Sequence, residues 1–177
     1  MNNSRNVIDQ LFGTLKKDSI RRNVQRSSKW LFNKIKKSRV LKTSKPKIGG
    51  LYLYVYDPKT KEKLPYYDTS PVVIIVDFAE NGFYGLNFHY LRLEERKILL
   101  KELNILYGSK NRQRINISYQ KLKAMGSVWK YAFKRYLFEQ LQSKLIPVRK
   151  DEWEDMIALP IASFKKETQK TVLQRKF

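Results

Sequence analysis

Residues 51–56 read Leu-Tyr-Leu-Tyr-Val-Tyr, and residues 72–76 read Val-Val-Ile-Ile-Val. The first run alternates aliphatic and tyrosine side chains, which a strand places on opposite faces. The second run is β-branched throughout, which is typical of a strand buried on both faces. Glu80-Asn-Gly82 then predicts a hairpin turn into a third strand over 83–90. Three strands with Gly and Pro at their corners predict a small, strongly bent sheet or barrel, and the fold that we expect is an SH3-like bent β-barrel.

Helical patterns lie on both sides of these strands. The spacing of apolar residues predicts helices over 1–40 (in two pieces), 91–107 and 119–125. Another helix is expected from Ser127, and its apolar face would hold Trp129, Phe133, Leu137 and Leu141. Residues 156–159 are expected to return as a strand, and the tail from Phe164 onward is expected to be helical. The predicted fold class is therefore α+β, a small barrel flanked by helices, with basic helical arms at both ends.

Positive charge is concentrated at the two ends of the sequence. The first 47 residues hold 14 of the 37 Lys and Arg residues but only two acids, and residues 164–177 hold five against one Glu. This distribution predicts a basic helical arm with a linker over 1–47, a globular α+β domain over 48–163, and a basic tail over 164–177. Concentrated positive charge favours a polyanionic partner such as nucleic acid, or an acidic protein surface.

The second helix predicted in the N-terminal arm is amphipathic and basic. Such a helix can lie on nucleic acid, on a membrane surface or on a partner protein, or it can dock on the chain's own core with its charges in solvent. Contacts with the DNA phosphate backbone would be non-specific in sequence and sensitive to salt. The predicted phosphate-contacting residues are Arg21, Arg22, Arg26, Lys29, Lys34, Lys36, Lys37 and Arg39.

The sequence offers little for catalysis, metal binding or a cofactor. It has no cysteine and a single histidine, His89, so thiolate metal sites and cysteine nucleophiles are excluded. We therefore expect no catalytic residues, no metal and no cofactor, and we interpret His89, Tyr66, Tyr67 and Asp68 as structural. No apolar run reaches the roughly 18–20 residues that cross a bilayer, and no signal-type segment begins the chain, so we expect a soluble intracellular protein without a membrane partner.

The strand region contains Gly50-Leu-Tyr-Leu-Tyr-Val-Tyr-Asp-Pro58 and Thr69-Ser-Pro-Val-Val-Ile-Ile-Val76. These two stretches resemble the opening of the PemK/MazF-like toxin barrels. The resemblance implies a small barrel and, in that family, ribonuclease activity. The catalytic arginine of that family precedes the Pro-Val run, where this chain has Ser70.

Six strings between Tyr54 and Phe164 carry a broader resemblance: Tyr56-Asp-Pro-Lys59, Leu64-Pro-Tyr-Tyr-Asp68, Gly82-Phe-Tyr-Gly-Leu-Asn-Phe-His-Tyr-Leu91, Lys134-Arg-Tyr-Leu137, Glu152-Trp153 and Leu159-Pro160. In these strings the chain is similar to a virion-associated protein family of T-even-like tailed bacteriophages, whose members are often labelled DNA end protectors. That resemblance implies a structural or DNA-handling role in the phage particle and supplies no catalytic residues.

The functional hypothesis is a non-enzymatic structural protein of a phage virion, assembled in the bacterial cytoplasm. It would bind or protect the packaged DNA end near the head–tail connection, in multiple copies and beside other virion proteins. The alternative is a tail or baseplate assembly protein whose basic arms bind neighbouring subunits. A third hypothesis, a PemK/MazF-like ribonuclease, predicts cleavage of single-stranded RNA without added metal.

Overall fold

The computed structural model describes residues 46–108, 127–158 and 162–174. The chain divides into a unit of residues 1–40 and a unit of residues 41–177, and every described residue belongs to the second unit. The helices predicted over 1–40 and 119–125 therefore lie outside the described residues. Within the second unit the fold is mixed α+β, which confirms the predicted class.

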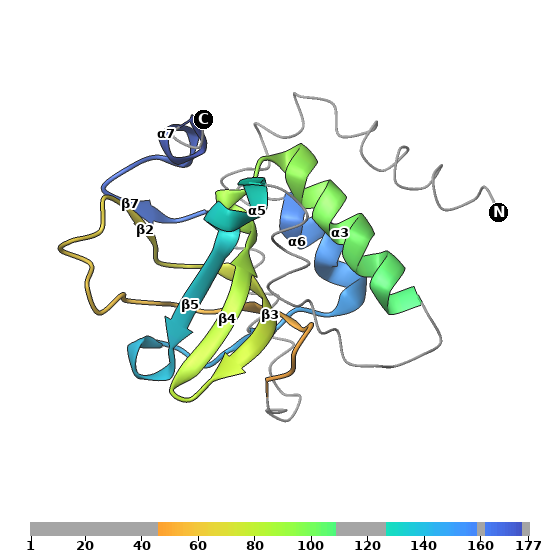
Figure 1. Cartoon of the computed structure of the whole chain (residues 1–177), viewed down its shortest axis with the longest axis horizontal. Coiled ribbons are helices and arrows are strands. Elements are labelled where there is room, and N and C mark those ends of the chain that lie inside the picture. The colour runs from red at the N-terminus through yellow and green to blue at the C-terminus, as the bar shows by residue number, and fades with distance from the viewer. Residues whose placement is uncertain (1–45, 109–126, 159–161, 175–177) are drawn as a thin grey trace. The chain divides into compact units, whose positions relative to one another are not determined.

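An antiparallel five-stranded sheet forms the centre of this unit (Figure 1). Its strand order is β5-β4-β3-β1-β6, and β5 and β6 lie at opposite edges although they are consecutive in the chain. A second sheet pairs only two short strands, β2 (Tyr67–Asp68) and β7 (Phe164–Lys165). The strands of the large sheet are β1 (Leu51–Leu53), β3 (Val72–Ala79), β4 (Gly82–Asn87), β5 (Phe133–Leu137) and β6 (Ile146–Pro147).

The α-helices of the described residues are α3 (Leu93–Gly108), α5 (Ser127–Ala132), α6 (Trp153–Ala158) and α7 (Gln169–Gln174). Helices α3 and α6 lie side by side next to the large sheet (Figure 1). The connections contain the 3-10 helices η2 (Phe88–Tyr90), η3 (Phe138–Gln140) and η4 (Lys150–Glu152).

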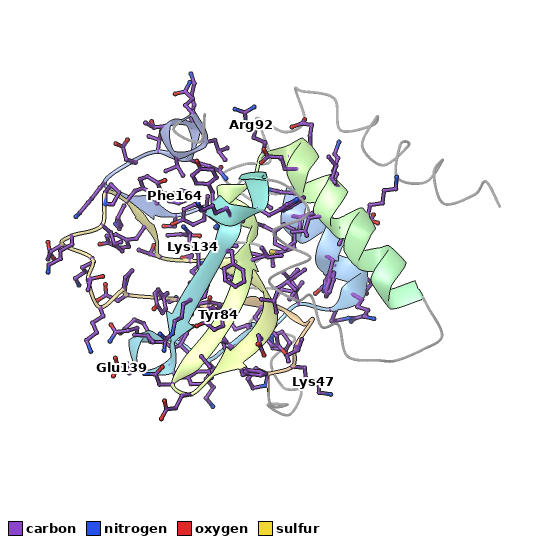
Figure 2. The ribbon with its side chains drawn as sticks, in the orientation of Figure 1. Lys47, Tyr84, Arg92, Lys134, Glu139 and Phe164 are labelled. Atoms are coloured by element: carbon purple, nitrogen blue, oxygen red, sulfur yellow. The ribbon has the colours of Figure 1, made fainter. Side chains whose placement is uncertain are left out.

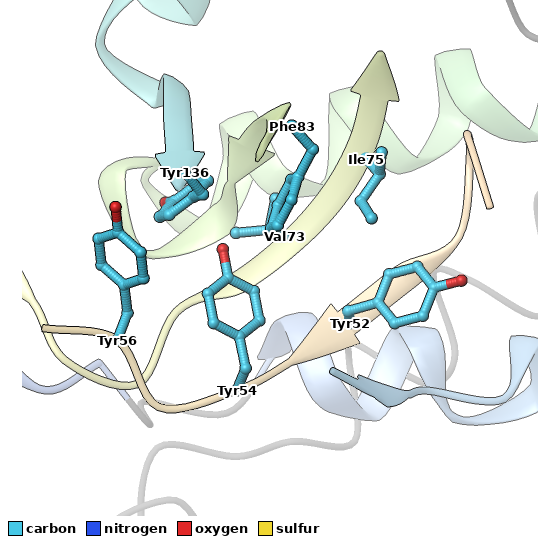
Figure 3. Packing of buried hydrophobic residues seen from close by; sticks show 7 residues of the cluster. All are labelled: Tyr52, Tyr54, Tyr56, Val73, Ile75, Phe83 and Tyr136. Atoms are coloured by element: carbon cyan, nitrogen blue, oxygen red, sulfur yellow. The ribbon is translucent and has the colours of Figure 1, made fainter. Parts of the chain in front are cut away.

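The tyrosines of the 51–56 segment form an aromatic core. Tyr54 is fully buried, and its ring makes edge-on contacts with Phe83 of β4 and Tyr136 of β5. Figure 3 shows Tyr54 and Tyr56 both pointing from this segment toward Tyr136. These rings are therefore core residues, as the sequence favoured, and are closed off from stacking on bases.

The opposite face of the sheet is aliphatic and equally buried. Leu51, Leu53 and Ile74 are at most 1% exposed, and buried residues of α3 and α6 such as Leu99 and Met156 complete this second core. The prediction that the strand over 72–76 is buried on both faces is confirmed, and residues 51–54 are buried on both faces as well. Val55 is 37% exposed, because the paired part of β1 ends at Leu53.

The long helix predicted from Ser127 is wrong beyond Ala132, because residues 133–137 form strand β5. The spacing of Trp129, Phe133 and Leu137 fits a helix, but Trp129 belongs to α5, and the buried residue of β5 is Tyr136. Pairing with β4 decides between helix and strand, because it places Tyr136 beside Phe83 in the aromatic core.

Other boundaries also differ from the prediction. The returning strand expected over 156–159 is wrong for its described residues, which belong to α6. The third strand ends at Asn87 and continues as η2, because the Asn87 side chain accepts a hydrogen bond from the His89 backbone N–H. The described strands form an open sheet and no closed barrel, so the SH3-like barrel and the basic arms stay predictions.

Candidate nucleic-acid interface

All eight predicted phosphate-contacting residues, Arg21 to Arg39, lie outside the described residues. The distribution of charge explains why the predicted phosphate contacts lie in the arm. The 108 described residues contain 17 Lys and Arg against 14 Asp and Glu, a net charge of +3. The other 69 residues contain 20 Lys and Arg against two acids, a net charge of +18. The described residues are therefore close to neutral, whereas the second unit as a whole, residues 41–177, contains 26 Lys and Arg against 14 Asp and Glu.

One basic stretch inside the second unit was missed by the sequence reasoning. Between Glu102 and Glu139 the chain has eight Lys and Arg residues and no Asp or Glu. The described members of this stretch are Lys130, Lys134 and Arg135, at the end of α5 and in β5. The signal in the sequence is the absence of acids over 36 residues. Because only the charge at the two ends of the chain was considered, this stretch was missed.

The side chains of these three cationic residues have different surroundings. Lys130 is exposed, whereas the Lys134 ammonium lies 4.4 Å from the centre of the Tyr90 ring, over its face. Arg135 is exposed, and its guanidinium donates a hydrogen bond to Asn81 Oδ1 at 2.8 Å. Two of the three therefore present charge at the surface of the unit, next to the β3–β4 hairpin.

A buried polar cluster lies beneath this region. The Asp68 carboxylate is 2.6 Å from His89 Nδ1 and accepts hydrogen bonds from the Asn87 side chain and the Ser70 backbone N–H. Asn87 also donates to the Tyr136 hydroxyl, which joins the cluster to the aromatic core. Asp68 and His89 are both nearly inaccessible to solvent, in agreement with the structural role expected for them.

The pKa of Asp68 reports how strongly this cluster holds a negative charge. Burial by itself raises the pKa of a carboxyl group, because it penalises the charged form. The His89 ring and the hydrogen bonds from His89, Asn87 and Ser70 outweigh burial, so the pKa of Asp68 is lowered. The cluster is thus built around an ionised carboxylate, and among the described residues His89 Nε2 has no hydrogen-bond partner.

The described part of the predicted C-terminal tail is tied to the loop between β1 and β3. Strand β7 pairs with β2, and the backbone N–H and the hydroxyl of Thr69 donate hydrogen bonds to the carbonyl and hydroxyl oxygens of Ser163. The Lys166 ammonium donates to the carbonyl oxygens of Lys61, Glu62 and Leu64 at 2.8–3.1 Å. The Phe164 ring packs edge-on against Tyr66 and Tyr90 (Figure 2 labels Phe164). Residues 162–168 are therefore an integral part of the second unit.

The described residues include no group of three or more His, Asp or Glu side chains that could hold a metal ion. In the same ranges, no helix has the length and apolar character needed to cross a membrane.

A comparison with protein-family models identifies the chain. The model of the phage T4 terminal DNA protecting protein family matches residues 1–176. The chain belongs to this family. The match extends over both the basic N-terminal segment and the folded unit, and it confirms the resemblance to a DNA end protector of T-even-like phages.

Neither the curated proteins nor the solved structures include a match to this chain. The family description names protection of phage DNA ends and no chemical reaction. It therefore supports a DNA-protecting role of a phage protein, and it does not specify a position in the particle.

Proposed function

We propose that this protein binds the ends of packaged phage DNA and shields them, near the head–tail connection of the virion and without catalysing a reaction. The observation that carries the proposal is the family match over residues 1–176. The charge distribution supports it, because a net charge of +18 lies outside the nearly neutral described residues. Clustered cations of this kind neutralise phosphates.

In this proposal the two parts of the chain have different tasks. The arm over 1–47 contacts the phosphate backbone through Arg21, Arg22, Arg26, Lys29, Lys34, Lys36, Lys37 and Arg39. The second unit is the rigid scaffold. Its strand order is β5-β4-β3-β1-β6, and η3 connects the edge strands β5 and β6 along the chain. This arrangement supports the proposal of an SH3-like fold. Several copies, in contact with other virion proteins, would surround the DNA end.

The experiment measures DNA binding and resistance of a linear duplex to a processive exonuclease. One full-length variant changes all eight arm residues to Gln. Each phosphate contact contributes about −0.9 to the slope of log affinity against log salt, so this slope should become smaller in magnitude by roughly 7. Exonuclease protection should disappear with it.

The matched control removes the same charge from exposed positions of the second unit and should keep most binding and protection. It changes to Gln the residues Lys59, Lys63, Lys101, Lys144, Arg149, Lys150, Lys165 and Lys170. Equal losses in both variants would reject a specific role of the arm. Unchanged DNA binding in the arm variant, with failed particle assembly, would support the tail or baseplate alternative. Cleavage of single-stranded RNA by the wild-type protein would support the ribonuclease hypothesis.

A further inference from the structure

Recognition of a DNA end needs more than positive charge. Lys and Arg contact phosphates at any point along a duplex, so a charged arm does not distinguish an end from the interior. An end also presents the flat face of its last base pair, which elsewhere is covered by the next pair. Aromatic side chains stack on bases with little regard to sequence. Selective binding of ends is therefore expected where exposed aromatic rings lie beside cations.

Helix α5 and the adjoining part of β4 and β5 combine these features. Tyr131, near the end of α5, is 38% exposed, and Tyr84 of β4 is partly exposed. The Tyr84 ring stacks on Phe133 of β5 with a centroid distance of 5.6 Å and an angle of 7° between the planes. Figure 2 shows Tyr84 in this part of the unit. We call Tyr84, Lys130, Tyr131, Phe133 and Arg135 the α5–β5 surface.

The register of the sheet places a cation next to Tyr84. Arg135 is the direct ladder partner of Tyr84, so both side chains project from the same face. Lys130 adds a second exposed ammonium one residue before Tyr131. On the other side of Tyr84, its partner on β3 is the exposed Asp77. The α5–β5 surface is therefore positive on the side of β5 and α5, whereas Asp77 places a negative charge at its edge on β3.

Among the described residues, the two aromatic side chains that are as exposed as Tyr131 have acidic neighbours. Phe78 is 39% exposed, but it lies between Asp77 and the exposed Glu80 of the hairpin. Phe138 is 40% exposed and is followed directly by the exposed Glu139. Phosphates would be repelled at both places. Charge complementarity thus favours the α5–β5 surface: Tyr84 borders Asp77, but its other ladder partner is Arg135, and the remaining members of the surface lie in the acid-free stretch between Glu102 and Glu139.

We propose that the α5–β5 surface binds the terminal base pair of duplex DNA. Tyr84 and Tyr131 stack on the exposed base pair, Phe133 supports the Tyr84 ring from below, and Lys130 and Arg135 contact the last phosphates. The inference rests on the proposed DNA-end function. It adds the place and the chemistry by which an end is distinguished from the interior.

The experiment compares full-length variants on two duplexes of identical sequence, one with open blunt ends and one with both ends closed by hairpin loops. Tyr84→Leu and Tyr131→Leu keep apolar bulk but remove the flat ring. Each should weaken binding to the open duplex about 5- to 100-fold, because base–aromatic stacking contributes on this scale. Binding to the closed duplex should stay within about twofold of the wild type. Asp77→Asn should strengthen binding to the open duplex, because it removes the bordering negative charge.

Phe138→Leu is the matched control, since it removes an equally exposed ring from an acidic part of the surface, and it should bind both duplexes as the wild type does. Circular dichroism and the unfolding midpoint confirm that each variant is folded. The variant Tyr84→Phe keeps the ring and should bind open ends with the affinity of the wild type.

Wild-type affinity for open ends in both Leu variants would overturn this inference but leave the proposed function standing. Equal affinity of the wild type for both duplexes would do the same. Absence of any DNA binding by the wild type would overturn both.

Discussion

The Nζ atom of Lys166 lies 2.8 Å from the carbonyl oxygen of Lys61, 105 positions earlier in the chain. Two further carbonyls, of Glu62 and Leu64, accept from the same ammonium, so all three of its N–H donors have partners. The backbone of Lys166 has φ = 69°, the left-handed region that non-glycine residues adopt at a cost of about 1–3 kcal/mol. The ammonium contacts therefore hold an unfavourable backbone conformation in place.

The first prediction concerns this contact. Lys166→Met removes the ammonium but keeps the backbone cost, so it should lower the unfolding midpoint and speed proteolytic cleavage within residues 162–174. Lys166→Gly removes both, and should be less destabilising than Lys166→Met by about 1 kcal/mol. Urea unfolding and limited proteolysis measure the difference. A Met variant as stable as the wild type would show that the three carbonyl contacts contribute nothing.

The second prediction is a pH dependence. Because the pKa of Asp68 is lowered in the folded protein, its contribution to stability is present above the unfolded value of about 3.9 and is lost as the pH falls through the lower, folded pKa. His89→Gln removes the largest interaction that lowers this pKa, so acid unfolding should begin at a higher pH than in the wild type. Asp68→Asn should be less stable at pH 7 and should lose this part of the acid dependence. Superimposable pH profiles of the wild type and both variants would contradict the assignment.

The third prediction concerns Arg96, which is 5% exposed. Its guanidinium donates to the carbonyl oxygen of Leu91 at 2.8 Å and to that of Ile157 at 2.9 Å, and so joins α3 to α6. Burial lowers the pKa of Arg96 to about 10. A lysine ammonium cannot reproduce the planar two-sided geometry, so Arg96→Lys should lower the free energy of unfolding by about 2–3 kcal/mol. The exposed Arg92→Lys is the control and should change it by less than about 0.5 kcal/mol.

The fourth prediction concerns Gly82 at the start of β4. A Cβ atom at this position would overlap the backbone carbonyl of Tyr136 on β5, which cannot move without breaking the ladder. Gly82→Ala should therefore cost about 2–3 kcal/mol of stability. Glu80→Ala, in the exposed hairpin two residues earlier, should be close to neutral. Equal midpoints for both variants in urea unfolding would show that β5 can shift away from β4.

Local patterns predicted the part of the fold that depends on neighbouring residues. The alternation at 51–56, the β-branched run at 72–76 and the turn at Glu80-Asn-Gly82 each carry their own signal, and α3 follows from helical spacing. Strand β5 could not be found this way, because its apolar spacing also fits a helix and its partner β4 is distant in sequence. Tertiary pairing decided between the two.

The candidate site shows the same limit. The arm residues were singled out from charge alone, and their contacts stay a prediction. The α5–β5 surface depends on Tyr84 and Arg135 being ladder partners across 51 positions, which no local pattern reveals. The Asp68–His89 pair and the Lys61–Lys166 contact are likewise non-local. Only the acid-free stretch between Glu102 and Glu139 was visible in the sequence.

Strands β4 and β5 are neighbours in the sheet but lie far apart in the sequence, and this affects how the protein folds. The β3–β4 hairpin closes through a local turn and can form early, whereas β5 must arrive across the long intervening segment. Until then β4 is an edge strand with unpaired backbone groups and the apolar side chains of Phe83 and Leu86 uncovered. Self-association through this temporary edge is the side reaction expected to compete with folding, and the yield of native protein should fall as the concentration during refolding rises.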